Sequence, residues 1–186
     1  IVIAATPEHT REIAIQLGKY GKKMRESVWE YVEFTRKIFP ILSFYYFQKL
    51  YVELAQISVT ERCTLRCQKC AHACNYVPIS ADDMPLKEVK RSADCFFKNV
   101  DLVKEFVLIG GEPFLYKGLE EAITYIGERY RGQILLFAVT TNGTIIPNDT
   151  ILELCRKYDV TIRVSDYSVT LPKLKERYEL LYKKLQ

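Results

Sequence analysis

The sequence of 186 residues contains no hydrophobic run long enough to cross a bilayer. Its longest apolar stretch, residues 38–47, is interrupted by Pro40 and Ser43, whereas a spanning helix needs about 20 apolar residues. A signal-peptide pattern is also absent, so the six cysteines indicate free thiols in a reducing cytoplasm rather than a disulfide framework. We therefore expect a cytoplasmic protein without a membrane partner.

The sequence shows no large excess of one charge and no nucleotide-binding fingerprint. Its 27 Lys and Arg against 23 Asp and Glu leave a net charge of +4, which gives no case for a nucleic-acid partner. No G-x-G-x-x-G is present, so dinucleotide binding is not predicted. The chain opens on Ile1, directly in a strand-like run, and we expect it to be a fragment of a longer protein.

The first 51 residues are predicted to precede the main domain. Residues 1–5 have the pattern of a buried strand, and residues 11–20 that of an amphipathic helix. We interpret residues 1–20 as the C-terminal remnant of a Rossmann-like domain and residues 21–51 as a helical and aromatic connector. The aromatic run at residues 44–47 is expected to pack in a core or between domains.

From residue 52 onward, strand and helix patterns alternate. Strands are predicted at residues 54–60, 105–109, 133–140 and 161–165, and helices at residues 85–99, 118–130, 149–158 and 170–185. This alternation favours a parallel sheet with right-handed crossovers. The predicted fold class is therefore α/β, and in a parallel α/β barrel the functional groups lie on the loops after the strands.

Three cysteines with the spacing CxxxCxxC follow the first of these strands. Cys63, Cys67 and Cys70 lie on one predicted loop, where three thiolates can surround one face of a small metal centre. Three protein ligands leave one metal position open, as catalysis requires. A short cysteine cluster also fits structural zinc, so this motif alone leaves both interpretations open.

A second motif favours the catalytic interpretation. The apolar run at residues 106–109 ends in Gly110-Gly111-Glu112-Pro113, so GGEP follows the next predicted strand. In this order, the two motifs resemble those of the radical S-adenosylmethionine (radical SAM) superfamily. The resemblance continues through the TTNG of residues 140–143 and through Ser165-Asp166, so that it covers about residues 52–186. It implies a partial (β/α) barrel of six strands, of which this sequence contains the first four β–α units.

The resemblance also implies cofactors and partners. Cys63, Cys67 and Cys70 would ligate three irons of a 4Fe–4S cluster, and S-adenosylmethionine would bind the fourth iron. Reductive cleavage of S-adenosylmethionine would then give a 5′-deoxyadenosyl radical that abstracts hydrogen from a substrate. An electron donor such as flavodoxin or ferredoxin is implied, as is a substrate, either a small molecule or a peptide. No catalytic side chain beyond these ligands is predicted.

By the same resemblance, the residues that end the strands bind the cofactor. A ligand can approach glycine closely, and local carbonyls with a carboxylate suit the methionyl ammonium group. Asn142 is a candidate for hydrogen bonding to cofactor or substrate, and Ser165 and Asp166 for the ribose or the methionyl carboxylate. These three residues also have structural explanations as turn or helix-cap residues. The predicted cofactor-binding residues are Gly110, Gly111, Glu112, Pro113, Asn142, Ser165 and Asp166.

The remaining cysteines do not match a ligand pattern. Cys74 lies four residues after Cys70, but the spacing differs from that of ferredoxins, so we predict that Cys74 is free or faces the substrate. Cys95 and Cys155 fall on predicted helices and are expected to be small buried apolar side chains. The alternative function is a non-catalytic iron–sulfur electron carrier or zinc-binding module with four cysteine ligands, which would have no use for GGEP.

Overall fold

The computed structural model of this chain describes residues 2–3, 7–20 and 29–185. The chain divides into two compact units, Ile1–Glu53 and Leu54–Gln186. Over the described ranges, every helix is too short or too polar to cross a bilayer.

The first unit contains a small parallel sheet and short helices. Strand β1 (Val2–Ile3) pairs in parallel with β2 (Trp29–Glu30), and helix α1 (Pro7–Leu17) lies between them in the sequence. Helix α3 (Tyr31–Glu33) is followed by a π-helical turn at Phe34–Ile38 and by α4 (Phe39–Phe47). Residues 1, 4 and 5 of the predicted first strand lie outside the described residues, as do residues 21–28 of the predicted connector. The Rossmann-like origin of residues 1–20 and the connector role of residues 21–51 stay predictions.

The aromatic run on α4 is exposed, so it does not pack in a core of this unit, and its packing between domains stays a prediction. Phe44 is 58% exposed, and the exposure of the next three residues lies between 70% and 73%. Four consecutive helical residues span more than one full turn, so their side chains cannot all face one side. The buried residue of α4 is Ser43, and the Phe39 ring meets the Tyr51 ring edge-on at 5.0 Å.

The second unit is built on one four-stranded parallel sheet whose strand order, β3-β4-β5-β6, is also the order along the chain. In the register of the sheet, Phe106 lies opposite Phe137 and Val139 opposite Ile162. The α/β class and the succession of four β–α units are therefore confirmed. The strands are β3 (Tyr51–Thr60), β4 (Leu102–Gly110), β5 (Ile134–Thr141) and β6 (Val160–Val164).

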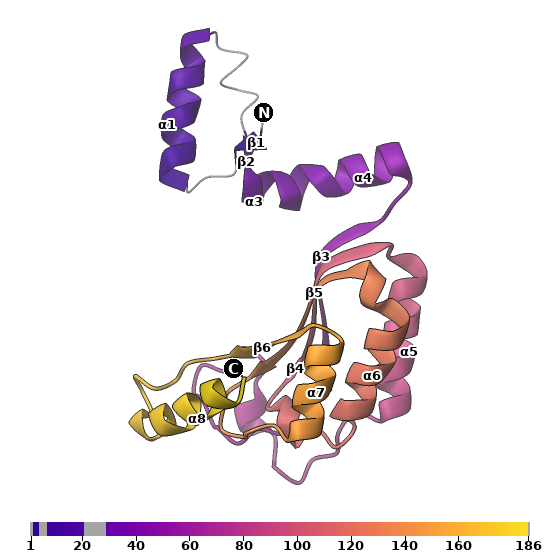
Figure 1. The fold of residues 1–186 in the computed structure, drawn as a ribbon, viewed down its shortest axis with the longest axis vertical. Coiled ribbons are helices and arrows are strands. Elements are labelled where there is room, and N and C mark those ends of the chain that lie inside the picture. The colour runs from indigo at the N-terminus through magenta and orange to yellow at the C-terminus, as the bar shows by residue number, and fades with distance from the viewer. Residues whose placement is uncertain (1, 4–6, 21–28, 186) are drawn as a thin grey trace. The chain divides into compact units, whose positions relative to one another are not determined.

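Three helices lie along one face of this sheet (Figure 1): α5 (Leu86–Asn99), α6 (Leu119–Tyr130) and α7 (Asp149–Lys157). Helix α8 (Lys175–Leu185) follows β6 and a short 3-10 turn at Pro172–Leu174. On α5 the buried side chains recur every four residues, at Val89, Ala93 and Phe97. Cys95 lies off this stripe and is exposed, so its predicted burial is wrong, whereas Cys155 on α7 is buried as predicted.

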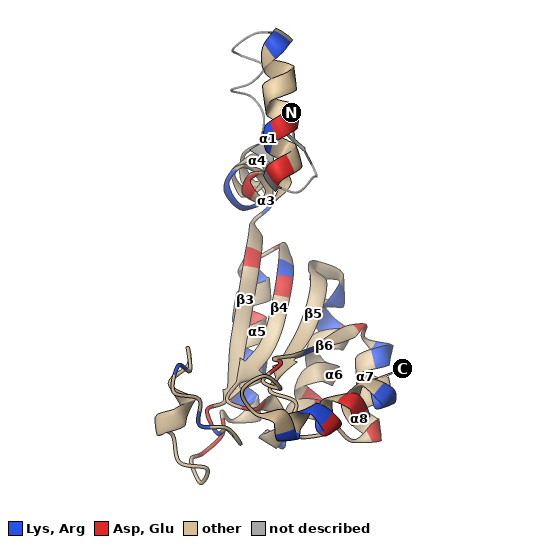
Figure 2. Ribbon diagram, turned by 90° about the vertical axis from the view of Figure 1, so that its left-hand side faces the viewer, with Lys and Arg blue, Asp and Glu red and all other residues tan. Residues whose placement is uncertain are grey.

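Aromatic side chains fill the space between the sheet and these helices. The Phe97 ring lies 5.0 Å from the Phe106 ring and stacks on Tyr130 at 4.5 Å, and Phe106 meets Phe137 at 6.0 Å. Burying each such side chain contributes roughly 1.5–3 kcal/mol. Because the strands are parallel, the loops that follow them gather at the same edge of the sheet, at its lower end in Figure 2. Every predicted site residue falls in or next to these loops.

Candidate functional site

The loops after the four strands enclose a pocket of about 270 Å³. Each strand contributes to the pocket: β3 through the cysteine loop, β4 through the double glycine, and β5 and β6 through the residues that follow them. The predicted residues that line it are Cys63, Cys67, Cys70, Gly110, Gly111, Asn142 and Ser165. Glu112, Pro113 and Asp166 were predicted to bind cofactor but are not among its lining residues.

The cysteine sulfurs occupy different environments. Cys63 Sγ accepts hydrogen bonds from the Leu65 backbone N–H at 3.4 Å and from Asn142 Nδ2 at 3.5 Å. Burial raises the pKa of the Cys63 thiol, and these two hydrogen bonds oppose the shift. Burial also acts to raise the pKa of the Cys70 thiol. Hydrogen bonds from backbone N–H groups in the turn over residues 72–75 have the larger effect, so the pKa of Cys70 is lowered. The loop's own backbone thus favours a thiolate at position 70, the form in which cysteine binds metal.

The three thiols share the pocket without converging on a single point. Over residues 2–3, 7–20 and 29–185, no group of three or more His, Cys, Asp or Glu side chains is placed to hold one metal ion. Thiolate is nevertheless a ligand suited to both zinc and iron–sulfur clusters. The three thiols therefore fit a thiolate-bound metal group, either zinc or an iron–sulfur cluster.

The double glycine is required by the neighbouring strand. A Cβ atom on Gly110 would come within 2.0 Å of the Thr60 carbonyl oxygen, and a Cβ on Gly111 within 2.2 Å of the Arg62 carbonyl oxygen. The Gly111 N–H donates to the Thr60 carbonyl at 2.8 Å, and the Glu112 N–H donates to the Arg62 carbonyl at 2.8 Å. The glycines therefore let the GGEP turn lie against the start of the cysteine loop. This packing requires glycine at both positions whether or not a ligand also approaches them.

Glu112 is fully buried, with 0% of its surface exposed. Its carboxylate accepts hydrogen bonds from the Phe114 N–H at 3.1 Å and from the Asn142 N–H at 2.9 Å, and Thr141 Oγ1 lies 2.8–2.9 Å from both of its oxygens. Burial raises the pKa of Glu112, although these hydrogen bonds oppose the shift. The carboxylate of Glu112 is thus fully bonded within the protein, and binding of the methionyl ammonium group by the backbone around Gly111 and Glu112 stays a prediction. Glu112 ties the GGEP turn to the TTNG turn.

The Asn142 side chain is engaged at both ends within the protein. Its Nδ2 donates to Thr64 Oγ1 at 3.1 Å as well as to Cys63 Sγ. Its Oδ1 accepts from the Thr144 N–H at 2.9 Å and from Thr144 Oγ1 at 2.6 Å. Although Asn142 was predicted to reach cofactor or substrate, in this structure it links the first cysteine to the end of β5.

Ser165 and Asp166 differ in their surroundings. Ser165 lines the pocket, and its N–H donates to the Thr141 carbonyl at 2.9 Å, which prolongs the pairing of β5 with β6. Asp166 is exposed, and its Oδ1 accepts from the Ser168 N–H at 2.7 Å. Hydrogen bonds from the Ser168 side chain and N–H lower the pKa of Asp166. Asp166 thus closes a local turn, whereas the structural explanation predicted for it was a helix N-cap; the next 3-10 helix has Leu171 as its N-cap.

Two tyrosines that no sequence motif marks also build the site. The hydroxyl of Tyr178, buried on α8, lies 3.1 Å from the Asn142 carbonyl and 3.2 Å from the Ser165 carbonyl, and it accepts from the Tyr167 N–H at 3.1 Å. Tyr167 lines the pocket, where burial, the charge of Cys67 and a hydrogen bond with the Cys67 side chain raise the pKa of Tyr167. The position of Tyr167 just after the fourth strand is a signal that could have found it, whereas Tyr178 lies on an ordinary amphipathic helix.

A charge pair anchors the start of the cysteine loop. Arg62 donates to Asp83 through Nε at 2.8 Å and Nη2 at 2.7 Å, and its Nη2 also donates to the Leu115 carbonyl at 2.9 Å. Thr60 Oγ1 donates to Asp83 at 2.7 Å. Burial of Asp83 opposes ionisation, but its bonds to Arg62 and Thr60 outweigh it, so that the pKa of Asp83 is lowered. The residue before Cys63 is thereby fixed to both neighbouring loops.

Cys74 lies beside Cys70 but is not among the residues that line the pocket. It is 3% exposed, its Sγ donates to the His72 carbonyl at 3.6 Å, and burial, followed by the charge of Cys70, raises the pKa of Cys74 to about 11. The buried position of Cys74 fits a free thiol better than a substrate-facing one. Lys69, within the CxxxCxxC motif, and His72 also line the pocket.

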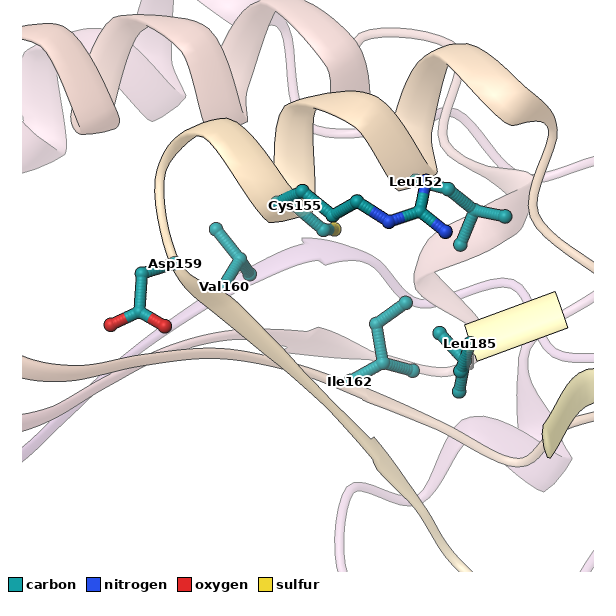
Figure 3. A pocket seen from close by; sticks show the side chains of 7 residues that line it. Leu152, Cys155, Asp159, Val160, Ile162 and Leu185 are labelled. Carbon is teal, nitrogen blue, oxygen red and sulfur yellow. The ribbon is translucent and has the colours of Figure 1, made fainter.

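A second pocket of about 310 Å³ lies away from these loops, between α7, β6 and the end of α8 (Figure 3). Its walls are mainly apolar, from Leu152, Val160, Ile162 and Leu185. The Cys155 thiol is set among these side chains, and burial raises the pKa of Cys155 to about 11. This environment suits an inert apolar thiol, and the pocket contains none of the predicted site residues.

A family model described as the Radical SAM superfamily matches residues 57–184. The chain belongs to the radical SAM superfamily. The matched residues of this radical SAM chain include the cysteine loop, the GGEP and TTNG turns and the residues after β6. The resemblance predicted from the two motifs is confirmed.

Several curated proteins similar to this radical SAM chain are GTP 3′,8-cyclases. The cyclase of Rhizobium leguminosarum bv. trifolii (strain WSM2304) is 32% identical over 94 residues, which cover 50% of the chain and 26% of the cyclase. That of Aliarcobacter butzleri (strain RM4018) is 35% identical over 101 residues, which cover 51% of the chain and 28% of the cyclase. The chain thus spans about a quarter of the length of these relatives.

A similar solved structure is SuiB of Streptococcus suis bound to S-adenosylmethionine, at 18% identity and a TM-score of 0.49. The superposition covers 82% of this chain and 35% of SuiB.

Proposed function

We propose that this protein binds a 4Fe–4S cluster through Cys63, Cys67 and Cys70 and cleaves S-adenosylmethionine reductively. When bound and reduced, the two cofactors supply a 5′-deoxyadenosyl radical for hydrogen abstraction from a substrate. The observation that carries the proposal is that the three thiols and the double glycine, which are far apart in the sequence, line one pocket. Membership of the superfamily supports it as well.

The surroundings of the thiols favour a cluster over zinc. Cys63, Cys67 and Cys70 border the same pocket as Gly110 and Gly111, and a structural zinc site has no use for this double glycine. Cys74, the fourth ligand that an electron carrier would need, lies beside Cys70 but does not line the pocket. Both features support the enzyme over the electron-carrier and zinc-module alternatives.

The residues around the pocket would hold S-adenosylmethionine in place. Gly110, Gly111 and Ser165 line the pocket, so these three are the cofactor contacts that we retain. Glu112 and Pro113 act by shaping the turn: the carboxylate of Glu112 is internal, and Pro113 begins the 3-10 turn Pro113–Leu115. Asn142 acts through Cys63, and Asp166 closes a local turn.

The partners follow from this chemistry. Reduction of the cluster requires a one-electron donor, for which flavodoxin or ferredoxin in the cytoplasm is suited. The substrate is a small molecule or a peptide. The curated relatives are named for a reaction of GTP, so a nucleotide is one candidate among the small molecules.

Anaerobic reconstitution of the full-length protein tests the proposed function. Analysis of iron, acid-labile sulfide and zinc should give iron and sulfide in equal amounts and little zinc. Addition of S-adenosylmethionine to the reduced protein should change the paramagnetic spectrum of the cluster. Stoichiometric zinc without sulfide, or a spectrum that ignores S-adenosylmethionine, would contradict the proposal.

A further inference from the structure

The Asn142 amide reaches across the pocket to the first cysteine. Its Nδ2 lies 3.5 Å from Cys63 Sγ, a normal distance for a hydrogen bond to sulfur, and the two residues come from the loops after β5 and β3. The Leu65 N–H is the other donor to this sulfur, at 3.4 Å. Cys63 therefore receives one hydrogen bond from its own loop and one from a different strand.

Hydrogen bonds to the backbone and side chain of Asn142 fix its amide in the position that contacts Cys63 Sγ. Its backbone N–H donates to Glu112 at 2.9 Å, and its carbonyl accepts from the Tyr178 hydroxyl at 3.1 Å. The two hydrogen bonds from Thr144 to Oδ1 orient the amide so that the NH₂ group points to Cys63 and Thr64. A side chain with both ends occupied is poorly placed to turn toward a cofactor or substrate.

We propose that Asn142 is a positioning residue, which orients Cys63 and, through the hydrogen bond to its sulfur, makes the reduction potential of the bound cluster less negative. This inference rests on the proposed function. Reduction adds negative charge to the cluster and its sulfurs, and a donor pointed at sulfur stabilises that charge. Hydrogen bonding to the sulfurs is one of the factors that set cluster potentials.

Redox titration of the reconstituted full-length protein, followed by the paramagnetic signal of the reduced cluster, tests the inference. Asn142→Ala removes the donor, and Asn142→Asp keeps the oxygen that accepts from Thr144 but replaces the donor by a negative charge. Both variants should have a more negative midpoint potential than the parent, with the aspartate variant the lower of the two. Asn148→Ala is the matched control, because Asn148 caps α7 through a bond to the Ile151 N–H at 2.8 Å and makes no sulfur contact. Its midpoint potential should equal that of the parent.

Iron and sulfide content, measured on the same samples, separates this inference from the proposed function. The content of the parent reports on the cluster itself, and the difference in potential between parent and variants reports on Asn142. Loss of iron in the Asn142 variants, with full retention in Asn148→Ala, would support the orienting role. If both Asn142 variants hold a full cluster at the potential of the parent, the inference is overturned.

Discussion

At the scale of single residues, the GGEP turn depends on the missing Cβ of Gly111. Substitution by alanine would press the new methyl group against the backbone oxygens of Arg62 and Glu61, at 2.2 and 2.8 Å, and backbone cannot rotate away as a side chain can. We expect Gly111→Ala to lower the free energy of unfolding by about 1–3 kcal/mol or more, the usual cost of overpacking. Denaturant unfolding of the purified protein measures this.

Gly132→Ala provides the matched control. A Cβ at Gly132 would have no atom within 4 Å. The same chemical change should therefore leave the stability unchanged or raise it slightly, because alanine restricts the unfolded chain. Equal stabilities of the two variants would show that the contact between the GGEP turn and the cysteine loop is looser than described.

Cys74 should not be required for metal binding. Its side chain is buried, donates to the His72 carbonyl and does not line the pocket. Cys74→Ala should therefore retain the iron and sulfide content of the parent after anaerobic reconstitution, while Cys70→Ala should lose most of it. Loss of iron in Cys74→Ala, to the extent seen in Cys70→Ala, would favour the four-ligand electron carrier.

Which residues line the pocket could be predicted where a motif coincides with the end of a strand. The cysteines, the double glycine, Asn142 and Ser165 were found in this way. The contacts of Glu112 were not predictable, because a carboxylate in a turn is ordinarily exposed and its donors, Thr141 and Asn142, come from the next strand. Tyr178 escaped notice for the same reason, since its partners are fixed by tertiary packing.

At the scale of elements, the Arg62–Asp83 pair joins the end of β3 to the segment before α5. The two side chains are 18% and 20% exposed, so the pair is largely shielded from water. Asp83→Asn leaves the Arg62 charge partly buried without its partner. We expect a loss of about 1–3 kcal/mol in the free energy of unfolding. The exposed neighbour Asp82 gives the control, Asp82→Asn, which should be close to neutral.

The same pair predicts a dependence on pH. The lowered pKa of Asp83 means that the folded protein holds this proton less tightly than the unfolded chain, whose aspartates titrate near about 3.9. The stabilisation is therefore fully present above that value and is lost as the pH falls through the folded pKa. The stability difference between parent and Asp83→Asn should shrink below about pH 4. A difference that is constant from pH 7 to pH 3 would contradict the assignment.

The helices and strands after residue 52 were predictable because the spacing of apolar residues there is regular. The predicted helix at residues 85–99 and the observed Leu86–Asn99 nearly coincide. The strand predicted at residues 105–109 begins three residues earlier and ends one residue later, at Leu102–Gly110. Which helix face is buried was less certain, as the exposure of Cys95 shows. Cys95 is exposed because α5 buries the face that carries Val89, Ala93 and Phe97. Which face is buried depends on how α5 packs against the sheet.

At the scale of the whole molecule, the order of the strands creates the site. Four parallel strands in sequential order place the loops after them at one edge, so motifs about 20 to 100 residues apart meet without any long-range signal in the sequence. Hydrogen bonds between neighbouring loops then fix the cysteine loop against the GGEP turn and the GGEP turn against the TTNG turn. We therefore propose that S-adenosylmethionine is bound and cleaved at this edge of the sheet.

The direct test is formation of 5′-deoxyadenosine. Full-length protein, reconstituted anaerobically and reduced with dithionite, is incubated with S-adenosylmethionine, and the products are separated by chromatography. The parent should release 5′-deoxyadenosine and methionine, Cys67→Ala should release none above background, and Cys95→Ala, whose thiol is exposed on α5, should match the parent. Absence of product from a parent that carries a full cluster, or undiminished product from Cys67→Ala, would contradict the account.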